Sequence, residues 1–314
     1  VRSGAMVIAL GERNDVQLYR AILDAGARDY LVKPVDLGML NAAFAKLETP
    51  ANGARQLGRR IAFIGARGGV GTSQVASNCA WIMAENLRRK VYLIDLDLHF
   101  GTLALLLDVQ GASGLGEALQ DPDRVDQVFL ENASVRLGKQ LYLLAAEDNL
   151  EGDRAAEDPK GASSLLEQAA LISDAVLVDL PRHMVARHPA LLGQFDELVL
   201  VTDPTLVGLR DGCRLLRLVR ARFGDKKTYI VVNHREQKAE VSDKEMEKGL
   251  EAKVDAKLNY ARDAVLRSEM AGEPLAKESP KHPLVQALTR LTVQLAGVRE
   301  APKRPSLLSR FAKR

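Results

Sequence analysis

Short apolar runs alternate with helix-like segments along most of this chain of 314 residues. Such alternation predicts a parallel sheet with helices on both faces, and almost entirely apolar strands are typical of a sheet buried on both sides. The expected fold class is therefore α/β, with a doubly wound, mainly parallel sheet. Its strands are expected at 61–65, 91–95, 141–145, 175–179, 197–202 and 228–233.

The start of the chain has a pattern of its own. Residues 1–47 predict a strand, a helix, a strand and a helix in that order. The strands are expected near 7–10 and 30–32, and the helices near 16–25 and 37–47.

A linker is expected between this block and the rest. Residues 48–58 lack apolar periodicity and contain Pro50, Gly53 and Gly58. We therefore expect four parts, which are a small block at 1–47, a linker at 48–58, a large domain at 59–298 and a basic tail at 299–314.

The net charge of +3 is unevenly distributed. The tail holds six basic residues against Glu300, a net of +5, so residues 1–298 carry −2. A body close to neutral gives no reason to expect a broad nucleic-acid-binding face. Two cysteines in the whole chain exclude a disulfide framework and favour a reducing, cytoplasmic compartment.

A glycine-dense turn joins the first strand of the large domain to the next helix. It reads Gly65-Ala-Arg-Gly-Gly-Val-Gly-Thr-Ser73. Glycines let backbone N–H groups converge on an anion, and a helix N-terminus adds partial positive charge, so this turn predicts a phosphate site. The alternative is a turn that only packs the helix on the strand. A strict G-x-x-x-x-G-K-[ST] pattern fails, because Ala66 and Thr72 replace its first Gly and its Lys.

Carboxylates follow two later strands of the predicted sheet. Asp95 and Asp97 come at the end of one strand, and Asp179 ends another. Ligands of open α/β sheets bind at the carboxyl ends of the strands, where these residues and the turn are expected to meet. Mg²⁺ prefers oxygen ligands, so Ser73, Asp95 and Asp179 are the candidate ligands, directly or through water.

These elements together resemble those of the MinD/ParA-type P-loop ATPases. The turn resembles a deviant P-loop, Asp95-Leu-Asp97 with Gly101 resembles switch I, and Val178-Asp-Leu-Pro181 resembles Walker B. The resemblance covers residues 59–298 and implies ATP or ADP with Mg²⁺ as ligands and a homodimer as the assembly. It assigns to Asn233 a contact with the edge of the adenine base. The alternative is that Asn233 is an ordinary turn residue at the end of a strand. The residues it assigns to the nucleotide in the turn are Arg67, Gly68, Gly69, Val70, Gly71, Thr72, Ser73 and Gln74.

Within that superfamily the sequence resembles the TadZ/CpaE proteins, which help to place and assemble type IVb (Flp/Tad) pili. The ARGGVGTS form of the turn is one reason. The other is Gly26-Ala-Arg-Asp-Tyr30-Leu-Val-Lys-Pro34, which is similar to the end of a response-regulator receiver domain. Block 1–47 would be the second half of an atypical receiver, without the phosphoacceptor, and Gly11 stands where an active receiver has Ser or Thr.

The departures from the family pattern predict weak chemistry. Thr72 replaces the P-loop lysine and Arg67 the second, signature lysine that reaches the partner's nucleotide. Arg67 keeps a forked charge, whereas Thr72 has none. Loss of one charged hydrogen bond weakens affinity by about one to two decades. Asp97, which the resemblance assigns to orienting the attacking water, is the one catalytic candidate; a solvated loop carboxylate is the alternative.

The sequence therefore favours a nucleotide-responsive localisation and scaffolding factor of a pilus machine, with slow or no hydrolysis. Its expected partners are a second copy and a pilus component or polar landmark. The alternatives are an active MinD/ParA-type ATPase that cycles on the membrane and a scaffold that binds no nucleotide. Residues 303–314 predict either a basic amphipathic helix at the inner membrane surface or a frayed end.

Overall fold

The computed structural model divides the chain into two compact units, Val1–Gln56 and Leu57–Arg314. The described residues of the smaller unit are 7–13, 15, 18, 19, 22, 27, 29–40 and 43, and those of the larger unit are 57–110, 114–145, 159–233 and 239–297. The basic tail and most of the expected linker lie outside the described residues.

The smaller unit has two parallel strands, β1 (Ile8–Gly11) and β2 (Asp29–Val32). Gly11 lies against the ring of Tyr30, because a Cβ there would lie 2.1 Å from the Tyr30 hydroxyl oxygen, so a larger residue would displace that ring. Residues 18, 19, 22, 37–40 and 43 are helical, as the sequence predicts, and the other residues of those two expected helices lie outside the described part. Reading this unit as a partial receiver stays a prediction.

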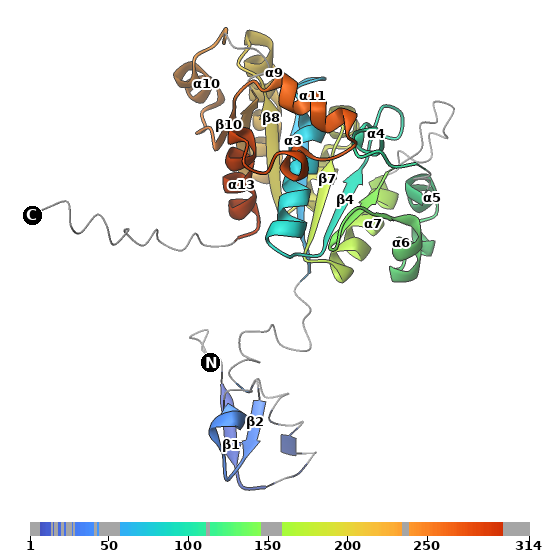
Figure 1. Ribbon diagram of the computed structural model, residues 1–314, viewed down its shortest axis with the longest axis vertical. Coiled ribbons are helices and arrows are strands. Elements are labelled where there is room, and N and C mark those ends of the chain that lie inside the picture. The colour runs from blue at the N-terminus through green and yellow to red at the C-terminus, as the bar shows by residue number, and fades with distance from the viewer. Residues whose placement is uncertain are drawn as a thin grey trace, which may run out of the picture. The chain divides into compact units, whose positions relative to one another are not determined.

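The larger unit is built on an eight-stranded sheet with the order β10-β9-β8-β3-β7-β4-β6-β5 (Figure 1). Every pairing is parallel except that of β5 with β6. The six expected strands are confirmed within two residues at each end, and β5 and β10 are additional. The strands are β3 (Arg59–Gly65), β4 (Val91–Asp95), β5 (Val135–Arg136), β6 (Leu141–Leu144), β7 (Ala175–Asp179), β8 (Glu197–Thr202), β9 (Thr228–Asn233) and β10 (Ala256–Leu258).

Helices connect these strands, as a parallel sheet requires. The described α-helices are α3 (Thr72–Trp81), α4 (Leu103–Leu106), α5 (Gly114–Gln120), α6 (Gln127–Ala133), α7 (Pro159–Ile172), α8 (Arg182–Arg187), α9 (Leu206–Phe223), α10 (Asp243–Leu250), α11 (Arg262–Met270), α12 (Leu275–Glu278) and α13 (Pro283–Leu295). Shorter turns are η1 (Ile82–Asn86, π), η2 (Pro122–Arg124, 3₁₀) and η4 (Pro189–Gln194, 3₁₀).

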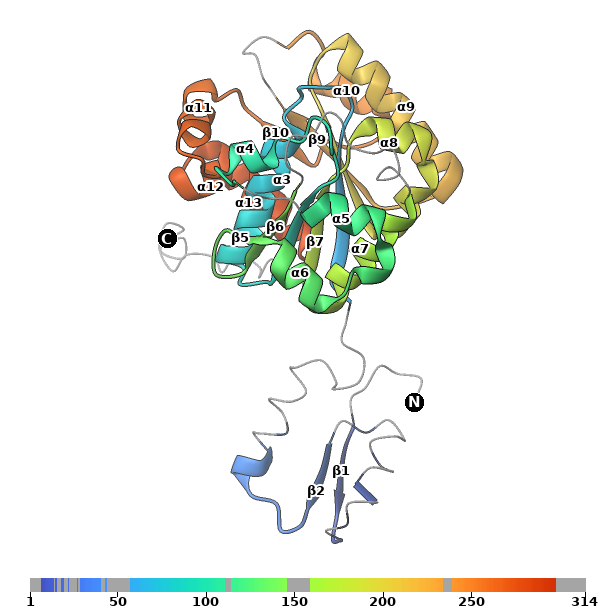
Figure 2. The same cartoon turned by 90° about the vertical axis from the view of Figure 1, so that its right-hand side faces the viewer.

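The helices form a layer on each face of the sheet, so the structure has three layers. Alternate residues of a strand point to opposite faces, and β3 shows this directly. Ile61 and Phe63 pack with α3 and α13, whereas Ala62 and Ile64 pack with α5 and α7. Figures 1 and 2 show α3 with α13 on one face and α5, α6 and α7 on the other. Among the described residues, no helix is both long and apolar enough to cross a membrane.

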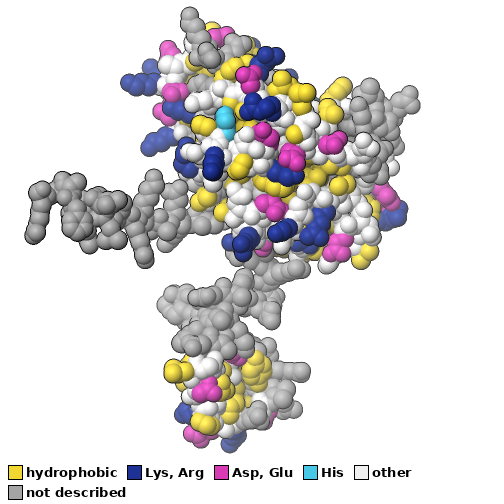
Figure 3. Space-filling view, viewed as in Figure 1, with side chains coloured by type: hydrophobic (Ala, Val, Ile, Leu, Met, Phe, Trp, Pro, Cys, Tyr) yellow, Lys and Arg dark blue, Asp and Glu magenta, His cyan; other side chains and the backbone are white. Residues whose placement is uncertain are grey.

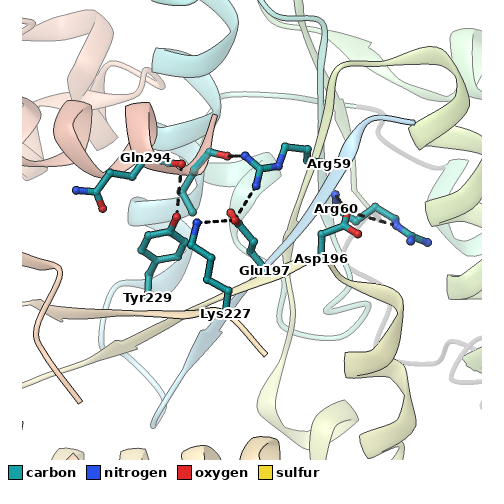
Figure 4. A network of polar contacts seen from close by, with 8 residues as sticks. Arg59, Arg60, Asp196, Glu197, Lys227, Tyr229 and Gln294 are labelled. Atoms are coloured by element: carbon teal, nitrogen blue, oxygen red, sulfur yellow. Dashed lines mark hydrogen bonds and ion pairs between the residues drawn. The ribbon is translucent and has the colours of Figure 1, made fainter. Parts of the chain in front are cut away.

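The amino edge of the sheet is closed by a polar network around Glu197, at the start of β8 (Figure 4). The Glu197 carboxylate is buried, with 4% of its side chain exposed, and Oε1 accepts hydrogen bonds from Arg59 Nη2 (2.7 Å) and Lys227 Nζ (2.9 Å). Arg59 also donates from Nη1 to the Leu295 carbonyl at the end of α13 (2.7 Å). The buried Glu197 carboxylate thus forms ion pairs with two cations, and Arg59 also caps the end of α13.

We expect Arg59→Met to lower the free energy of unfolding by about 1–3 kcal/mol, because it leaves the Leu295 carbonyl uncapped and the buried Glu197 with one cation. Urea denaturation followed by circular dichroism measures this loss. Lys227→Met is the matched control: more than half of that side chain is exposed, and its removal should cost less than about 1 kcal/mol. Equal losses for both variants would contradict the role given to Arg59.

Candidate functional site

The turn between β3 and α3 adopts a conformation that only glycine accommodates readily. Gly69 has φ 74° and Gly71 has φ 88°, both in the left-handed region. A Cβ on Gly71 would in addition lie 2.6 Å from Asn233 Nδ2. Helix α3 starts directly afterwards at Thr72, with no side-chain cap at its N-terminus and no acidic residue in its first turn. Its first N–H groups therefore lack intrahelical acceptors and keep the positive end of the helix dipole available.

Asn233 holds this turn from the side of β9. Its Nδ2 donates to the carbonyl oxygen of Val70, with an N···O distance of 2.8 Å. The contact joins the end of β9 to the turn, 163 residues away in sequence. Asn233 therefore lies beside the predicted phosphate site, and its role toward a nucleotide base stays a prediction.

Two carboxylates lie side by side at the carboxyl edge of the sheet. β4 and β7 are hydrogen-bonded neighbours, and their register pairs Asp95 with Asp179. Both residues are buried, with 2% and 9% exposure. Ser73 Oγ, in the first turn of α3, donates to Asp179 Oδ2 at 2.5 Å. The three oxygen-bearing residues proposed for Mg²⁺ are thus brought together from three elements.

Burial and mutual repulsion make this pair reluctant to ionise. Burial raises the pKa of Asp179 from its ordinary 3.8 to about 7, with a further rise from the Asp95 charge and an opposing effect of the Ser73 hydrogen bond. Burial also raises the pKa of Asp95 to about 6, although backbone N–H donors from Leu103 and Asp97 favour its charged form. A nearby cation would stabilise both carboxylates in the charged state.

Asp97 lies in the turn that follows β4. Its N–H donates to Asp95 Oδ1 (3.1 Å), and its own Oδ1 accepts from the N–H of Phe100 (3.0 Å). Gly101 closes this turn, because a Cβ there would lie 2.7 Å from Asp95 Oδ2 and 2.4 Å from the Asp97 carbonyl oxygen. The sequence Asp95-Leu-Asp97 with Gly101 therefore folds as one compact unit around the Asp95 carboxylate.

Arg67 is held by a partner that sequence reasoning missed. Its guanidinium pairs with both carboxylate oxygens of Asp203, through Nε to Oδ1 at 3.1 Å and through Nη2 to Oδ2. Asp203 follows β8 and is 3% exposed, and the Thr205 hydroxyl also donates to its Oδ1 (3.2 Å). Asp203 lies in the sequence Thr202-Asp-Pro204 directly after a strand, but nothing in its spacing indicates a contact with Arg67.

These residues line a cleft of about 1360 Å³ at the carboxyl edge of the sheet. All predicted site residues contribute to its wall except Val70, which is buried in the core at 1% exposure. Gln74 also bonds across the cleft wall, from Nε2 to Glu269 Oε1 on α11 (2.9 Å). In the described part of the chain, no group of three or more His, Cys, Asp or Glu side chains is placed to hold a metal ion. A cation in this cleft would therefore need the Ser73 hydroxyl or oxygens of its own ligand.

The rim of the cleft exposes large apolar side chains. These are Phe100, Leu105, and Leu266 and Met270 of α11, with exposures between 45% and 82%. Figure 3 shows apolar side chains among charged ones on the face that carries α4 and α11. An exposed apolar rim of this kind is typical of a surface that another molecule covers.

Comparison with solved structures assigns the fold. The chain is similar to a ParA family ATPase from Chlorobium tepidum, with a TM-score of 0.69 and 26% identity, covering 76% of this chain and 99% of that one. MinD from Pyrococcus furiosus gives a TM-score of 0.66 at 21% identity, covering 77% and 100%. MinD from Pyrococcus horikoshii, solved in complex with Mg-ADP, gives 0.65 at 21% identity, covering 76% and 96%. The predicted MinD/ParA-like fold is thereby confirmed.

Comparison with curated proteins points to the same family. The chain is 28% identical over 177 residues to the septum site-determining protein MinD of Synechocystis, across 56% of this chain and 64% of that protein. It is 21% identical over 253 residues to MinD of Bacillus subtilis, across 77% of this chain and 90% of that protein. No protein-family model matches the chain. These likenesses support a relationship with the MinD/ParA P-loop ATPases.

The carboxylate pair predicts an unusual pH dependence of the stability of the metal-free protein. Asp179 binds its proton more tightly in the folded state than in the unfolded state, so stability falls as the pH rises from about 4 to about 7. We expect Asp179→Asn to raise the free energy of unfolding at pH 8 by about 2–3 kcal/mol more than it does at pH 5, because most of the loss of wild-type stability lies between these two pH values. Urea denaturation in EDTA at the two pH values measures both quantities.

The control for this experiment is Asp123→Asn, which neutralises an exposed carboxylate in η2 and should change stability little at either pH. A variant Asp179→Asn that is equally stabilised at both pH values, or destabilised at pH 8, would contradict the buried charge repulsion at this site.

Proposed function

We propose, taking the relationship with the MinD and ParA ATPases as the premise, that this chain is a nucleotide-responsive scaffolding and localisation factor. In this proposal it binds ATP or ADP with Mg²⁺ in the cleft and hydrolyses ATP slowly or not at all. The single observation that carries the proposal is the convergence, at one edge of the sheet, of the uncapped α3 N-terminus with Ser73, Asp95 and Asp179.

The donors present fit a magnesium nucleotide. The glycine turn offers N–H groups next to a helix N-terminus, which is a general anion site. Ser73 and the two carboxylates offer the hard oxygen ligands that Mg²⁺ prefers, directly or through water. When bound, Mg²⁺ would neutralise negative charge on the phosphates. The crowded, buried carboxylates Asp95 and Asp179 support this assignment, because a cation would relieve the repulsion that raises their pKa values.

Slow hydrolysis is expected because two positions lack a positive charge that is free to contact phosphate. Thr72 offers a hydroxyl where a P-loop has a lysine. Arg67 keeps its charge, but Asp203 neutralises it and holds it through two contacts within the same chain. Positioned cations contribute much of the catalysis of phosphoryl transfer, so both features oppose turnover. Asp97 stays the candidate for orienting water, and it lines the cleft.

A homodimer that covers the cleft is part of the proposal. The exposed rim residues Phe100, Leu105 and Met270 support it, because a second copy placed over the cleft would remove their apolar surface from water. Leu266 and Tyr260, both more than 40% exposed, line the same cleft and extend this surface.

The biological setting that we propose is the assembly of a type IVb (Flp/Tad) pilus, in the cytoplasm and at the inner membrane near a cell pole. It rests on the resemblance of the ARGGVGTS turn and of the N-terminal block to the TadZ/CpaE proteins. Partners would be components of that machine or a polar landmark. The alternative is an active ATPase that cycles on the membrane, which the general similarity to MinD and ParA proteins would equally accommodate.

We expect Thr72→Lys to raise the affinity for ATP–Mg²⁺ by about ten- to a hundredfold, since it restores one charged hydrogen bond to phosphate. Isothermal titration calorimetry on the full chain measures this, and Ser73→Ala should weaken binding. Gln127→Lys on the exposed surface of α6 adds the same charge elsewhere and should leave affinity unchanged. If neither the wild type nor Thr72→Lys binds ATP at about millimolar concentration, the proposal is refuted.

A phosphate-release assay separates slow hydrolysis from the active-ATPase alternative. We expect turnover far below that of a MinD protein measured alongside, and any residual rate should fall at least about tenfold in Asp97→Ala. Turnover equal to that of the MinD protein would favour the alternative. A residual rate unchanged in Asp97→Ala would remove this residue from the proposed chemistry.

A further inference from the structure

Residues 1–298 are close to neutral in total, but their positive and negative charges are concentrated in different elements. Helices α8 and α9 together hold seven arginines, no lysine and one acidic residue, Asp211, a net of +6. The rest of residues 1–298 therefore carries −8. The two helices are neighbours, because Val185 of α8 and Leu215 and Val219 of α9 line the same small apolar gap. Figure 2 shows α8 and α9 next to each other on the outside of the larger unit.

Helix α9 is clearly two-sided. Its buried side, formed by Gly208, Gly212, Leu216 and Val219, packs on the sheet and on α10. Its opposite side exposes arginines at spacings of four and three residues, which places them in one row over about 10 Å. Apolar side chains that are 69% and 47% exposed precede this row at the start of the helix. We call the resulting surface the arginine face, and it consists of Arg182, Leu206, Val207, Arg210, Arg214 and Arg217.

The positive charge of this face is only partly compensated. Asp211 forms ion pairs with Arg210 (2.9 Å) and Arg214 (3.7 Å), whose side chains are nevertheless 64% and 73% exposed. The hydrogen bond from Arg210 lowers the pKa of Asp211, and the charges of Arg214 and Arg182 lower it further, so Arg182 of α8 lies within the same field. Within the described residues Arg217 has no ion pair, so the face keeps a surplus of positive charge.

We propose that the arginine face is a docking surface for an acidic segment of another protein, with carboxylates on the arginine row and apolar side chains on Leu206 and Val207. Guanidinium groups suit carboxylates because their planar forks can donate two parallel hydrogen bonds. Charge complementarity selects an anionic partner. Leu206 and Val207 at the start of the row add an apolar contact, which only an anionic partner with apolar groups of its own can make. Arg182 also lines the proposed nucleotide cleft, whereas the row Arg210, Arg214 and Arg217 does not, so the proposal for this row does not depend on nucleotide binding.

The composition of the face favours a polypeptide over a nucleic acid. Single-stranded nucleic acids bind through aromatic stacking as well as charge. Phe223 is the one aromatic residue of the two helices, and it is partly buried against the core. Leu206 and Val207 would face a phosphate backbone with no apolar partner, and the Asp211 carboxylate in the middle of the row would repel it. Protein interfaces, in contrast, combine arginine with apolar contacts.

The test uses two fluorescent peptides of equal charge, one of Glu and Ala and one of Glu and Leu, each with Glu at helical spacing. Binding is measured by anisotropy on the full chain. We expect the Glu/Leu peptide to bind more tightly than the Glu/Ala peptide. The variant Arg210→Gln/Arg214→Gln/Arg217→Gln should weaken binding by about ten- to a hundredfold, since three exposed ion pairs are lost. Gln maintains the helix while it removes the charge.

The matched control removes three exposed cations elsewhere and should change affinity less than about twofold. It is Arg89→Gln/Lys139→Gln/Lys281→Gln. The basic tail also attracts anions, so every variant is made in a full-length background whose tail cations are replaced by Gln. These are Arg299, Lys303, Arg304, Arg310, Lys313 and Arg314.

Several results would overturn the proposal. One is equal weakening in the control, and another is no binding of either peptide at about millimolar concentration. Arginine-dependent binding that is tighter for a DNA duplex or for phosphatidylglycerol vesicles would assign the face to those anions instead. Loss of self-association in the triple variant, measured by sedimentation, would assign it to a second copy. Hydrogen exchange that slows in residues 206–217 on peptide binding would support the proposal directly.

Discussion

Two buried carboxylates that face each other across neighbouring parallel strands impose the main constraint on this structure. Asp95 and Asp179 are paired by the β4–β7 register, so the sheet itself brings like charges together at its carboxyl edge. Burial makes their ionisation costly. Several local features follow from this pair: Ser73 bonds to one carboxylate, backbone N–H groups bond to the other, and Gly101 has no side chain because Asp95 occupies the space.

The two edges of the sheet handle buried charge in opposite ways. At the amino edge, the Glu197 carboxylate has two cations within hydrogen-bond distance, and this arrangement holds β8, β3 and the end of α13 together. At the carboxyl edge, the carboxylates have hydroxyl and N–H donors, and Arg67 of the glycine turn is paired with Asp203 instead. A ligand that brings positive charge can therefore be favoured at the carboxyl edge, at a cost to the stability of the empty fold.

Much of this arrangement could be predicted from the sequence. The apolar runs located six strands, and the glycine turn, Asp95 and Asp179 were expected at one edge because the strands are parallel. β5 and β10 were missed because they are two and three residues long, too short for a periodic signal. The pairing of Arg67 with Asp203 joins residues 136 positions apart and depends on the order of β3 and β8 in the sheet. The arginine face was missed because net charge was summed along the chain and not over neighbouring helices.

The central claim is that the carboxyl edge of the sheet holds a divalent cation together with a nucleotide. Crystals of the full chain grown with Mn²⁺ and a non-hydrolysable ATP analogue test it most directly, because manganese gives an anomalous signal that locates the ion. We predict an anomalous peak beside Ser73 Oγ, next to the Asp95 and Asp179 carboxylates, with phosphate density along Gly69 to Thr72. Nucleotide bound elsewhere, or a cleft without either ligand in crystals grown at saturating concentrations, would contradict the account.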